Sequence, residues 1–254
     1  MTNALRAAWS AGRPVRGVWC AAPSSVSAEV AALAGPDYVC VDMQHGAVGY
    51  SDAVPMLQAV QGAGAVPLVR VPAGDAATIG VALDAGALGV VVPMVSTPDD
   101  AARAVGACRY PPRGVRSYGP VRAAVAVGSR EVEDLEDVVC AVMVETVEGL
   151  SRVDEIAATP GLDAIYVGPA DLALALGLPP AYERPEPVHR EAVAAILAAC
   201  RRHGITAGIH CADGAMAARR LEQGFTMVTV ANDLGLVRAG VAAELRAADG
   251  GVPG

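Results

Sequence analysis

The chain has 254 residues, of which 53% are apolar and only 4% are aromatic, so its core must be built mainly from Val, Ala, Leu and Ile. A chain of this length can bury a large core, and such residues suit parallel sheets covered by helices. The formal net charge of −8 argues against a nucleic-acid partner, because phosphate binding requires a basic surface.

Lysine is absent from the sequence, and all nineteen basic residues are arginine. Schiff-base aldolases, pyridoxal-phosphate enzymes and Walker-type P-loops each require a lysine. These three chemistries are therefore excluded.

Six cysteines are scattered through the chain without a CxxC pair. This pattern indicates buried, reduced thiols in a cytoplasmic protein, and not a disulfide framework or a zinc site. The N-terminal segment contains no long apolar run, so we expect no signal peptide. The longest apolar stretches are too short to span a membrane.

In chain order, a first helix is predicted over 2–11, and eight apolar runs that favour strands follow it. The predicted strands are 15–20, 38–44, 66–71, 88–95, 138–146, 163–168, 205–210 and 225–233. Helical segments follow these strands, several of them opened by Ser, Asp or Pro. They are 23–35, 51–63, 75–85, 96–108, 147–159, 168–177, 187–203, 211–224 and 234–248.

Eight strand–helix units favour a closed (β/α)8 barrel, or TIM barrel, formed by a single domain over 1–254. A doubly wound open sheet is the alternative, but no GxGxxG follows the first strand, which removes its dinucleotide-binding form. Residues 109–137 interrupt the alternation, and we predict a long irregular connection there that serves as a lid or an interface loop.

Polar residues gather where the predicted strands end or lead into the next segment. They are Asp42, Gln44, His45, Arg70, Glu145, Asp171, His210 and Asn232. The carboxyl ends of barrel strands converge on one rim, where barrel enzymes place their active sites. The spacing predicts a site at that rim without specifying a reaction.

Glu145 and Asp171 are the candidate metal ligands. Two carboxylates from adjacent strands suit a hard divalent cation that keeps water and substrate oxygens as its other ligands. The alternative is structural, with Glu145 capping the following helix and Asp171 serving as a carboxylate at a helix N-terminus.

His45 and Arg70 are the candidate catalytic side chains. Asp42 could orient the imidazole of His45 as a general base, although a capping or packing histidine is the alternative. Arg70 ends an apolar strand, where it could stabilise a developing oxyanion. Its alternative role is a structural ion pair with Asp42 or Asp84.

The segment GPADL provides a further feature. Gly168 permits close approach of the backbone, Pro169 suits a first helical turn, and the N–H groups near Ala170 and Asp171 could bind a carboxylate. Any strand-to-helix turn could have this pattern, so alone it is a weak motif.

The chain has four histidines. Besides His45, His210 ends the seventh predicted strand and could reach the pocket. His189 and His203 flank the predicted helix 187–203, and we expect both at the surface.

With these residues in place, the chain resembles the HpcH/HpaI aldolase family of metal-dependent pyruvate aldolases, which includes 4-hydroxy-2-oxoheptanedioate aldolases. The resemblance covers nearly the whole chain and rests on VDMQHG, PLVRVP, LDAGALGVVVPMV, RYPPRGVRS, VMVET and YVGPADLALALG, in that order. It implies a (β/α)8 barrel in a homo-oligomer, a trimer or a hexamer, with the C-terminal helix exchanged with a neighbouring subunit. It also implies a Mg²⁺, Mn²⁺ or Co²⁺ cofactor, and a 2-oxo acid and an aldehyde as partners.

The resemblance also assigns roles to individual residues. Glu145 and Asp171 resemble the metal ligands, and His45 resembles the catalytic base paired with Asp42. Arg70 resembles the group that holds the keto oxygen and the enolate.

Further positions extend the resemblance or depart from it. The turn Gly168-Pro169-Ala170 resembles the clamp on the substrate carboxylate, and Asp84 matches a residue that reaches a neighbouring subunit's site. Gln44 replaces a usual glutamate, Met143 replaces a glutamine found in some members, and His210 stands where an apolar residue often lines the aldehyde pocket. We expect Gln44 and His210 to contact substrate.

The leading functional hypothesis is reversible aldol cleavage of a 4-hydroxy-2-oxo acid into pyruvate, or a close 2-oxo acid, and an aldehyde. A second hypothesis is decarboxylation of oxaloacetate to an enolate that adds to another electrophile, as in macrophomate-synthase-like, citrate-forming or CoA-ester lyase relatives. The third is a 2-oxo-acid binding protein without turnover. Release of pyruvate or of CO₂ would distinguish them.

Overall fold

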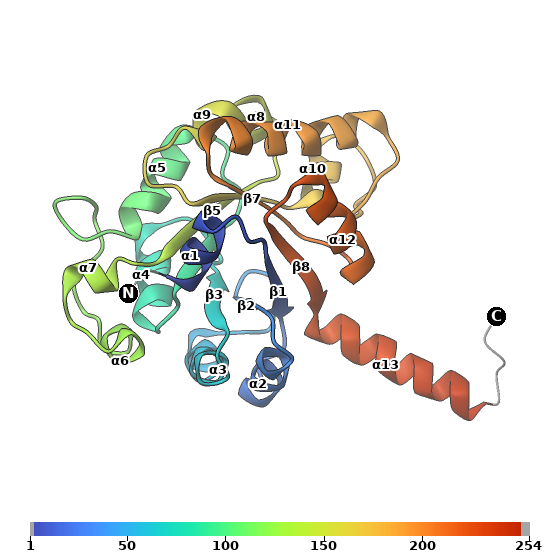
Figure 1. The fold of residues 1–254 in the computed structure, drawn as a ribbon, viewed down its shortest axis with the longest axis horizontal. Coiled ribbons are helices and arrows are strands. Elements are labelled where there is room, and N and C mark those ends of the chain that lie inside the picture. The colour runs from blue at the N-terminus through green and yellow to red at the C-terminus, as the bar shows by residue number, and fades with distance from the viewer. Residues whose placement is uncertain (1–2, 250–254) are drawn as a thin grey trace.

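Eight parallel strands form a closed barrel in which each strand pairs with its neighbours in sequence (Figure 1). This computed structural model describes residues 3–249, so residue 2 of the first predicted helix lies outside the described part. The strands are β1 (Val15–Cys20), β2 (Tyr38–Asp42), β3 (Val66–Arg70), β4 (Gly89–Val92), β5 (Val139–Val144), β6 (Ala164–Val167), β7 (Thr206–Ile209) and β8 (Met227–Asn232). The closed barrel confirms the predicted fold class and excludes the alternative, a doubly wound open sheet.

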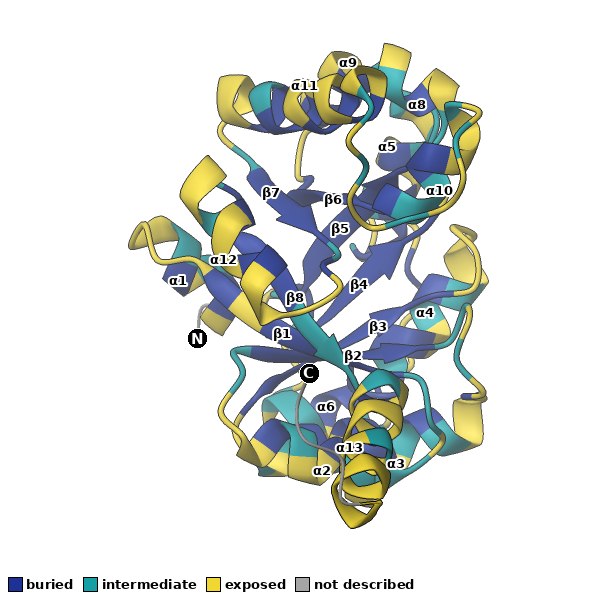
Figure 2. Ribbon diagram, turned by 90° about the vertical axis from the view of Figure 1, so that its right-hand side faces the viewer, coloured by how far each residue is buried: buried dark blue, intermediate teal, exposed yellow. Residues whose placement is uncertain are grey.

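Helices surround the barrel, with buried faces toward the strands and exposed faces outward (Figure 2). They are α1 (Ala4–Ser10), α2 (Ser25–Leu33), α3 (Tyr50–Gly62), α4 (Ala76–Asp84), α5 (Pro98–Ala107), α6 (Ala123–Val127), α7 (Val132–Leu135), α8 (Val147–Ser151), α9 (Val153–Ala157), α10 (Pro169–Ala175), α11 (Pro187–His203), α12 (Gly214–Gln223) and α13 (Asp233–Ala248). Two details differ from prediction. The helix predicted over 147–159 is divided at Arg152, and the 109–137 connection contains α6 and α7.

Short polar side chains fix where several of these helices begin. Thr97 accepts a hydrogen bond from the N–H of Asp100, and the Asp100 carboxylate accepts from the N–H of Thr97, which forms a capping box at α5. Asp75, Thr146 and Asp213 accept similar bonds at α4, α8 and α12. These caps set the turns that leave the carboxyl ends of the strands.

Side chains alternate along the strands between the barrel interior and the layer beneath the helices. Tyr38 and Cys40 of β2 belong to the interior cluster, whereas Val39 and Val41 belong to the outer one. Gly17 pairs directly with Tyr38, and a Cβ at position 17 would lie 2.1 Å from the tyrosine ring. The interior is therefore filled by large rings placed opposite small residues.

Helix α1 closes the amino-terminal end of the barrel. Leu5 and Ala8 pack into the interior cluster, and the Asn3 side-chain amide donates to the carbonyl oxygens of Leu88 and Asp137. Because this end is covered, the carboxyl ends of the strands carry the accessible opening.

Helix α13 projects away from the barrel instead of folding back onto it (Figure 1). Among its residues only Asp233 is buried, where its carboxylate accepts from the N–H groups of Ala21 and Ala22. One face of α13 carries an exposed apolar stripe at helical spacing. It consists of Leu234, Val237, Val241 and Leu245.

All six cysteines are free and buried, as predicted from their positions in apolar runs. Across residues 3–249, none of the helices combines the length and the apolar composition needed to cross a membrane.

Candidate active site

A cavity of about 190 Å³ opens at the carboxyl ends of the strands. It is lined by His45, Arg70, Met143, Gly168, Pro169, Ala170, Asp171, Tyr182 and His210. Seven of these nine residues belong to the set proposed from the sequence. Convergence at this rim agrees with the location of active sites in barrel enzymes.

The register of β2 and β3 creates a buried ion pair at the edge of the cavity. Asp42 and Arg70 are direct neighbours across the two strands. Arg70 donates from Nε to Asp42 Oδ1 at 2.8 Å and from Nη2 to Oδ2 at 2.6 Å, and both side chains are buried. This fork-to-carboxylate geometry fixes the guanidinium in one orientation.

The Asp42 carboxylate contacts the backbone of the His45 turn and not the imidazole that it was expected to orient. Its Oδ1 atom accepts from the backbone N–H groups of Gln44, at 3.1 Å, and of His45, at 3.3 Å. The carboxylate therefore holds the turn that carries His45, whereas the sequence suggested that it would orient the imidazole. The His45 side chain is exposed at the mouth of the cavity.

The ion pair keeps both groups charged. Burial opposes ionisation of Asp42, but the hydrogen bonds and positive charge of Arg70 outweigh it and hold the Asp42 pKa below its ordinary value. Burial likewise opposes the charge of Arg70, and the Asp42 carboxylate nevertheless raises the Arg70 pKa. Only Nε and Nη2 of Arg70 are used in this pair, so the N–H groups of Nη1 remain for a substrate oxygen.

Glu145, directly after β5, places a buried carboxylate beside the cavity. The side chain is buried, and Oε1 accepts from the backbone N–H of Met94 at 2.8 Å. Oε2 is also buried and has no hydrogen-bond partner among residues 3–249. A buried carboxylate oxygen without a partner destabilises the folded protein unless a bound ligand interacts with it.

Two local backbone features hold Glu145 in place. Met94 has a φ of 59°, a left-handed conformation uncommon outside glycine, and its N–H is the donor to Glu145. On the other side, a Cβ at Gly168 would lie 2.1 Å from Glu145 Oε2. Glycine is therefore required at 168 for the carboxylate to occupy this position.

These residues fit a divalent cation. Burial raises the Glu145 pKa, the Met94 N–H opposes that change, and the negative charge of Asp171 adds to it. A cation between the two carboxylates would offset this cost, and carboxylate oxygens suit Mg²⁺, Mn²⁺ and Co²⁺. Within the described chain, no group of three or more His, Cys, Asp or Glu side chains is arranged to bind a metal. Glu145 and Asp171 would therefore leave most coordination positions to substrate and water.

Two aromatic residues that were not predicted from the sequence, Trp19 and Tyr182, contact the predicted His210, and Tyr182 also lines the cavity. The Trp19 ring lies 4.7 Å below the Arg70 guanidinium carbon, and its centroid is 4.8 Å from that of His210, with the rings edge to face. Tyr182 stacks on His210, with the ring centroids 5.2 Å apart. Burial, with a smaller contribution from the Arg70 charge, lowers the His210 pKa to about 4, so this imidazole is neutral at neutral pH.

The prediction that His189 lies at the surface is wrong. His189 is only 1% exposed, and its Nε2 lies 3.0 Å from the carbonyl oxygen of Pro169. The His189 ring therefore holds the Gly168–Asp171 turn in place through its contact with the Pro169 carbonyl oxygen. His203 is exposed, as predicted, and contacts Asp154.

Three other predicted positions lie outside the cavity. Gln44 is half-buried beside it, and its Oε1 has no partner among the described residues. Asn232 caps α13 by accepting from the Gly235 N–H. Asp84 ends α4 and pairs with Arg116 at 2.8 Å, at the opposite end of the barrel, so the chain does not bring it to the cavity.

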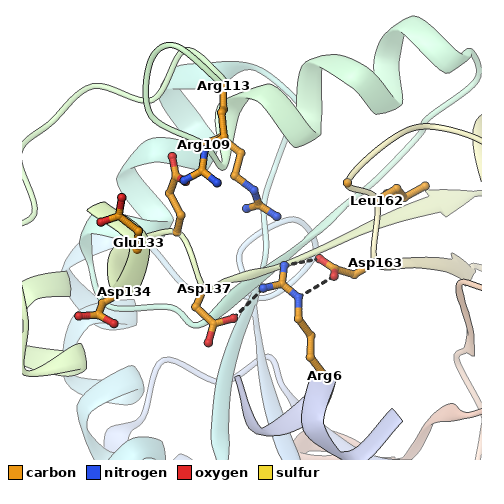
Figure 3. Close-up of a pocket in the computed structure, with 10 residues that line it drawn as sticks. Arg6, Arg109, Arg113, Glu133, Asp134, Asp137, Leu162 and Asp163 are labelled. Carbon is orange, nitrogen blue, oxygen red and sulfur yellow. Dashed lines mark hydrogen bonds and ion pairs between the residues drawn. The ribbon is translucent and has the colours of Figure 1, made fainter. Parts of the chain in front are cut away.

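A second cavity, of about 530 Å³, lies at that opposite end (Figure 3). Arg6 spans it and donates to Asp137 and Asp163, each at 2.7 Å. Arg113 likewise pairs with Glu136. The charges in this cavity are largely paired with one another, which indicates a structural role.

The chain matches the family model described as HpcH/HpaI aldolase/citrate lyase over residues 16–239. It is 38% identical to a hydroxypyruvate/pyruvate aldolase of Rhizorhabdus wittichii, over 93% of this chain and 95% of that protein. It is 37% identical to a 5-keto-4-deoxy-D-glucarate aldolase of Citrobacter koseri, over 93% of each.

Three solved structures share the fold over nearly the whole chain. An HpcH/HpaI family protein from Burkholderia cenocepacia J2315 superposes with a TM-score of 0.87 and 36% identity, over 93% of this chain and 95% of that one. Citrate Synthase SbnG gives a TM-score of 0.86 and 28% identity, over 97% of each chain. Macrophomate synthase gives 0.83 and 30%, over 96% of this chain and 88% of that one.

Proposed function

Because the chain belongs to the HpcH/HpaI aldolase/citrate lyase family and is a carbon–carbon lyase, we propose that it catalyses reversible aldol cleavage of 4-hydroxy-2-oxo acids to pyruvate, or a close 2-oxo acid, and an aldehyde. The observation that carries this proposal is the buried, unpaired Oε2 of Glu145 beside a cavity that also holds Asp171, Arg70 and His45. A carboxylate pair, a fixed cation and an imidazole are the groups that enolate chemistry requires.

Class II aldolases of this family generally depend on a divalent metal. We propose Mg²⁺, Mn²⁺ or Co²⁺ here, held by Glu145 and Asp171. When bound, the cation supplies Lewis acidity that favours the enolate of the 2-oxo acid. The absence of lysine from the sequence agrees with this route, because no Schiff base can replace the cation.

The protein side chains would divide the remaining work. Arg70, held rigidly by Asp42, would donate from Nη1 to the keto oxygen as negative charge develops there. His45, exposed at the cavity mouth, would take the proton of the 4-hydroxyl during cleavage and return it during condensation. The turn from Gly168 to Ala170, supported by His189, would receive the substrate carboxylate.

We also propose a homo-oligomer, a trimer or hexamer, in which α13 packs on a neighbouring subunit. The exposed stripe of Leu234, Val237, Val241 and Leu245 supports this, because a helix with such a face is not stable in water alone. Asp84 would reach a neighbouring site in the same assembly. The free, buried thiols support the proposed cytoplasmic location.

The decisive experiment measures pyruvate release from 4-hydroxy-2-oxo acids by EDTA-treated protein, before and after addition of Mg²⁺, Mn²⁺ or Co²⁺. We expect metal to restore release in the wild type and not in Glu145→Gln. A Glu191→Gln variant, altered on the exposed surface of α11, serves as the matched control. Absence of release with every metal, from a protein with an unchanged circular dichroism spectrum, would overturn the proposal.

Oxaloacetate decarboxylation followed by addition to another electrophile is the second candidate. The similarity to Citrate Synthase SbnG and macrophomate synthase and the presence of Gln44 support it. Metal-dependent CO₂ release from oxaloacetate, without pyruvate release from hydroxy-oxo acids, would favour this candidate.

A further inference from the structure

Tyr182 lies over the site without a role in the chemistry described above. It belongs to the connection between α10 and α11, and its ring stacks on His210 with the centroids 5.2 Å apart and the planes 30° from parallel. It lines the same cavity as Arg70 and His45. Its side chain is partly exposed, which places it at the cavity mouth.

The two residues that follow Tyr182 fix its position through their side-chain contacts. Glu183 accepts from Arg219 of α12 at 2.7 Å and lies 3.5 Å from Arg220, which is itself buried. Arg184 pairs with Glu186 at the start of α11. The ring is therefore held against His210 by a connection that is tied to two helices.

Among the described residues that line the cavity, none is a cation without a carboxylate partner. Arg70 is the one arginine among the lining residues, and its charge is matched by Asp42. The α12 arginines, Arg219 and Arg220, share the single carboxylate of Glu183 and do not line the cavity. A carboxylate on the incoming aldehyde would thus meet no free positive charge, whereas a hydroxyl group could bond to the phenol or the imidazole.

The cavity size adds a second restriction. At about 190 Å³ it is smaller than the ~300–1,000 Å³ of sites for drug-sized ligands. A 2-oxo acid placed against Glu145, Asp171 and Arg70 leaves only the space next to Tyr182 and His210 for its partner.

We propose that Tyr182 is a specificity-determining residue that restricts the acceptor to small, uncharged hydroxyaldehydes, and that Glu183 is its positioning residue. This inference rests on the proposed aldolase function. In condensation, the C3 carbon of pyruvate loses a proton and bonds to the aldehyde carbon, and the aldehyde oxygen gains a proton, so no oxidant or reductant is needed.

The test compares glycolaldehyde with succinic semialdehyde as acceptors for pyruvate. The wild type should prefer glycolaldehyde at least tenfold in kcat/KM. Tyr182→Ala should raise the KM for glycolaldehyde about tenfold, and Tyr182→Arg should shift the preference toward the anionic aldehyde. Glu183→Gln should raise the same KM by a smaller factor. Glu191→Gln, altered on the exposed surface of α11, is the matched control for Glu183→Gln.

Exchange of the pyruvate C3 protons with D₂O, followed by NMR, separates this inference from the proposed function. Exchange requires the enolate but no aldehyde, so it should stay within about twofold of wild type in all four variants. If exchange is normal while Tyr182→Ala keeps the wild-type KM, or the wild type uses both aldehydes equally, the inference is overturned. If the wild type shows neither exchange nor condensation, the aldolase proposal itself fails.

Discussion

His210 should make the folded protein lose stability in mild acid. Burial, and then the nearby charge of Arg70, lower its pKa from 6.5 to about 4. In the unfolded chain the imidazole titrates near its ordinary value. Between these two values the unfolded state binds a proton that the folded state does not, so the free energy of unfolding falls as the pH falls.

The size of the effect follows from these pKa values. Each pKa unit corresponds to ~1.36 kcal/mol, so lowering the pH from 7.5 to 5.0 should cost about 2 kcal/mol through His210 alone. Other groups also titrate in this range, so the comparison needs a variant. His210→Phe keeps a ring in contact with Trp19 and Tyr182 but binds no proton.

The assay is urea unfolding followed by far-UV circular dichroism at pH 7.5 and 5.0. All samples contain EDTA and the same protomer concentration, so that neither metal binding nor assembly contributes a pH-dependent difference. The wild type should lose about 2 kcal/mol more than His210→Phe between the two pH values. An equal loss in both proteins would refute the assignment of a neutral, half-buried His210.

Three further predictions concern the site and the assembly. Gly168→Ala should weaken Mn²⁺ binding by ~10–100-fold in calorimetry, because its Cβ would displace Glu145 Oε2; Gly62→Ala, where the added carbon meets nothing within 4 Å, should bind normally. Arg70→Ala should abolish most of kcat and lower the free energy of unfolding by ~3–5 kcal/mol, because Asp42 is left buried and unpaired. Arg70→Lys should restore little activity, since an ammonium cannot form the two-bond pair, and wild-type turnover in either Arg70 variant would exclude the proposed role. Val241→Asp should dissociate the proposed oligomer in light scattering, whereas Val188→Asp, on the exposed surface of α11, should not. An unchanged mass for Val241→Asp would exclude α13 from the proposed interface.

The barrel and much of its rim could be predicted because they depend on local pattern. Alternation along β2, β3 and β5 places Asp42, Arg70 and Glu145 on the interior side at the strand ends. This alternation can be predicted once the strand boundaries are known, and the apolar runs in the sequence mark those boundaries. Arg70 consequently lines the cavity, and the Asp42 and Glu145 carboxylates lie beside it.

Other parts of the site depend on contacts between distant segments. The left-handed φ of Met94 accompanies a hydrogen bond from its N–H to a carboxylate 51 positions later, and no sequence pattern marks this conformation. Tyr182 lies in an irregular connection whose path is set by Glu183 and α12. Trp19 could have been predicted as a site residue, because it is a rare aromatic residue near the end of a predicted strand.

The error at His189 has a related cause. A histidine in the first turn of a long helix is usually exposed, but this turn of α11 lies against the Pro169 carbonyl. Which face of a first turn is covered depends on the neighbouring element, here α10. The division of 147–159 at Arg152 similarly reflects packing and not composition.

The contact between Gly17 and Tyr38 has a consequence for how this sequence can diverge. The two residues are partners across β1 and β2, and the ring occupies the space that any side chain at 17 would need. A slip of one strand by a single residue would place the ring against Arg16 or Val18 and prevent barrel closure. Positions 17 and 38 should therefore covary in related proteins, with a larger residue at 17 accepted only where 38 has lost its ring.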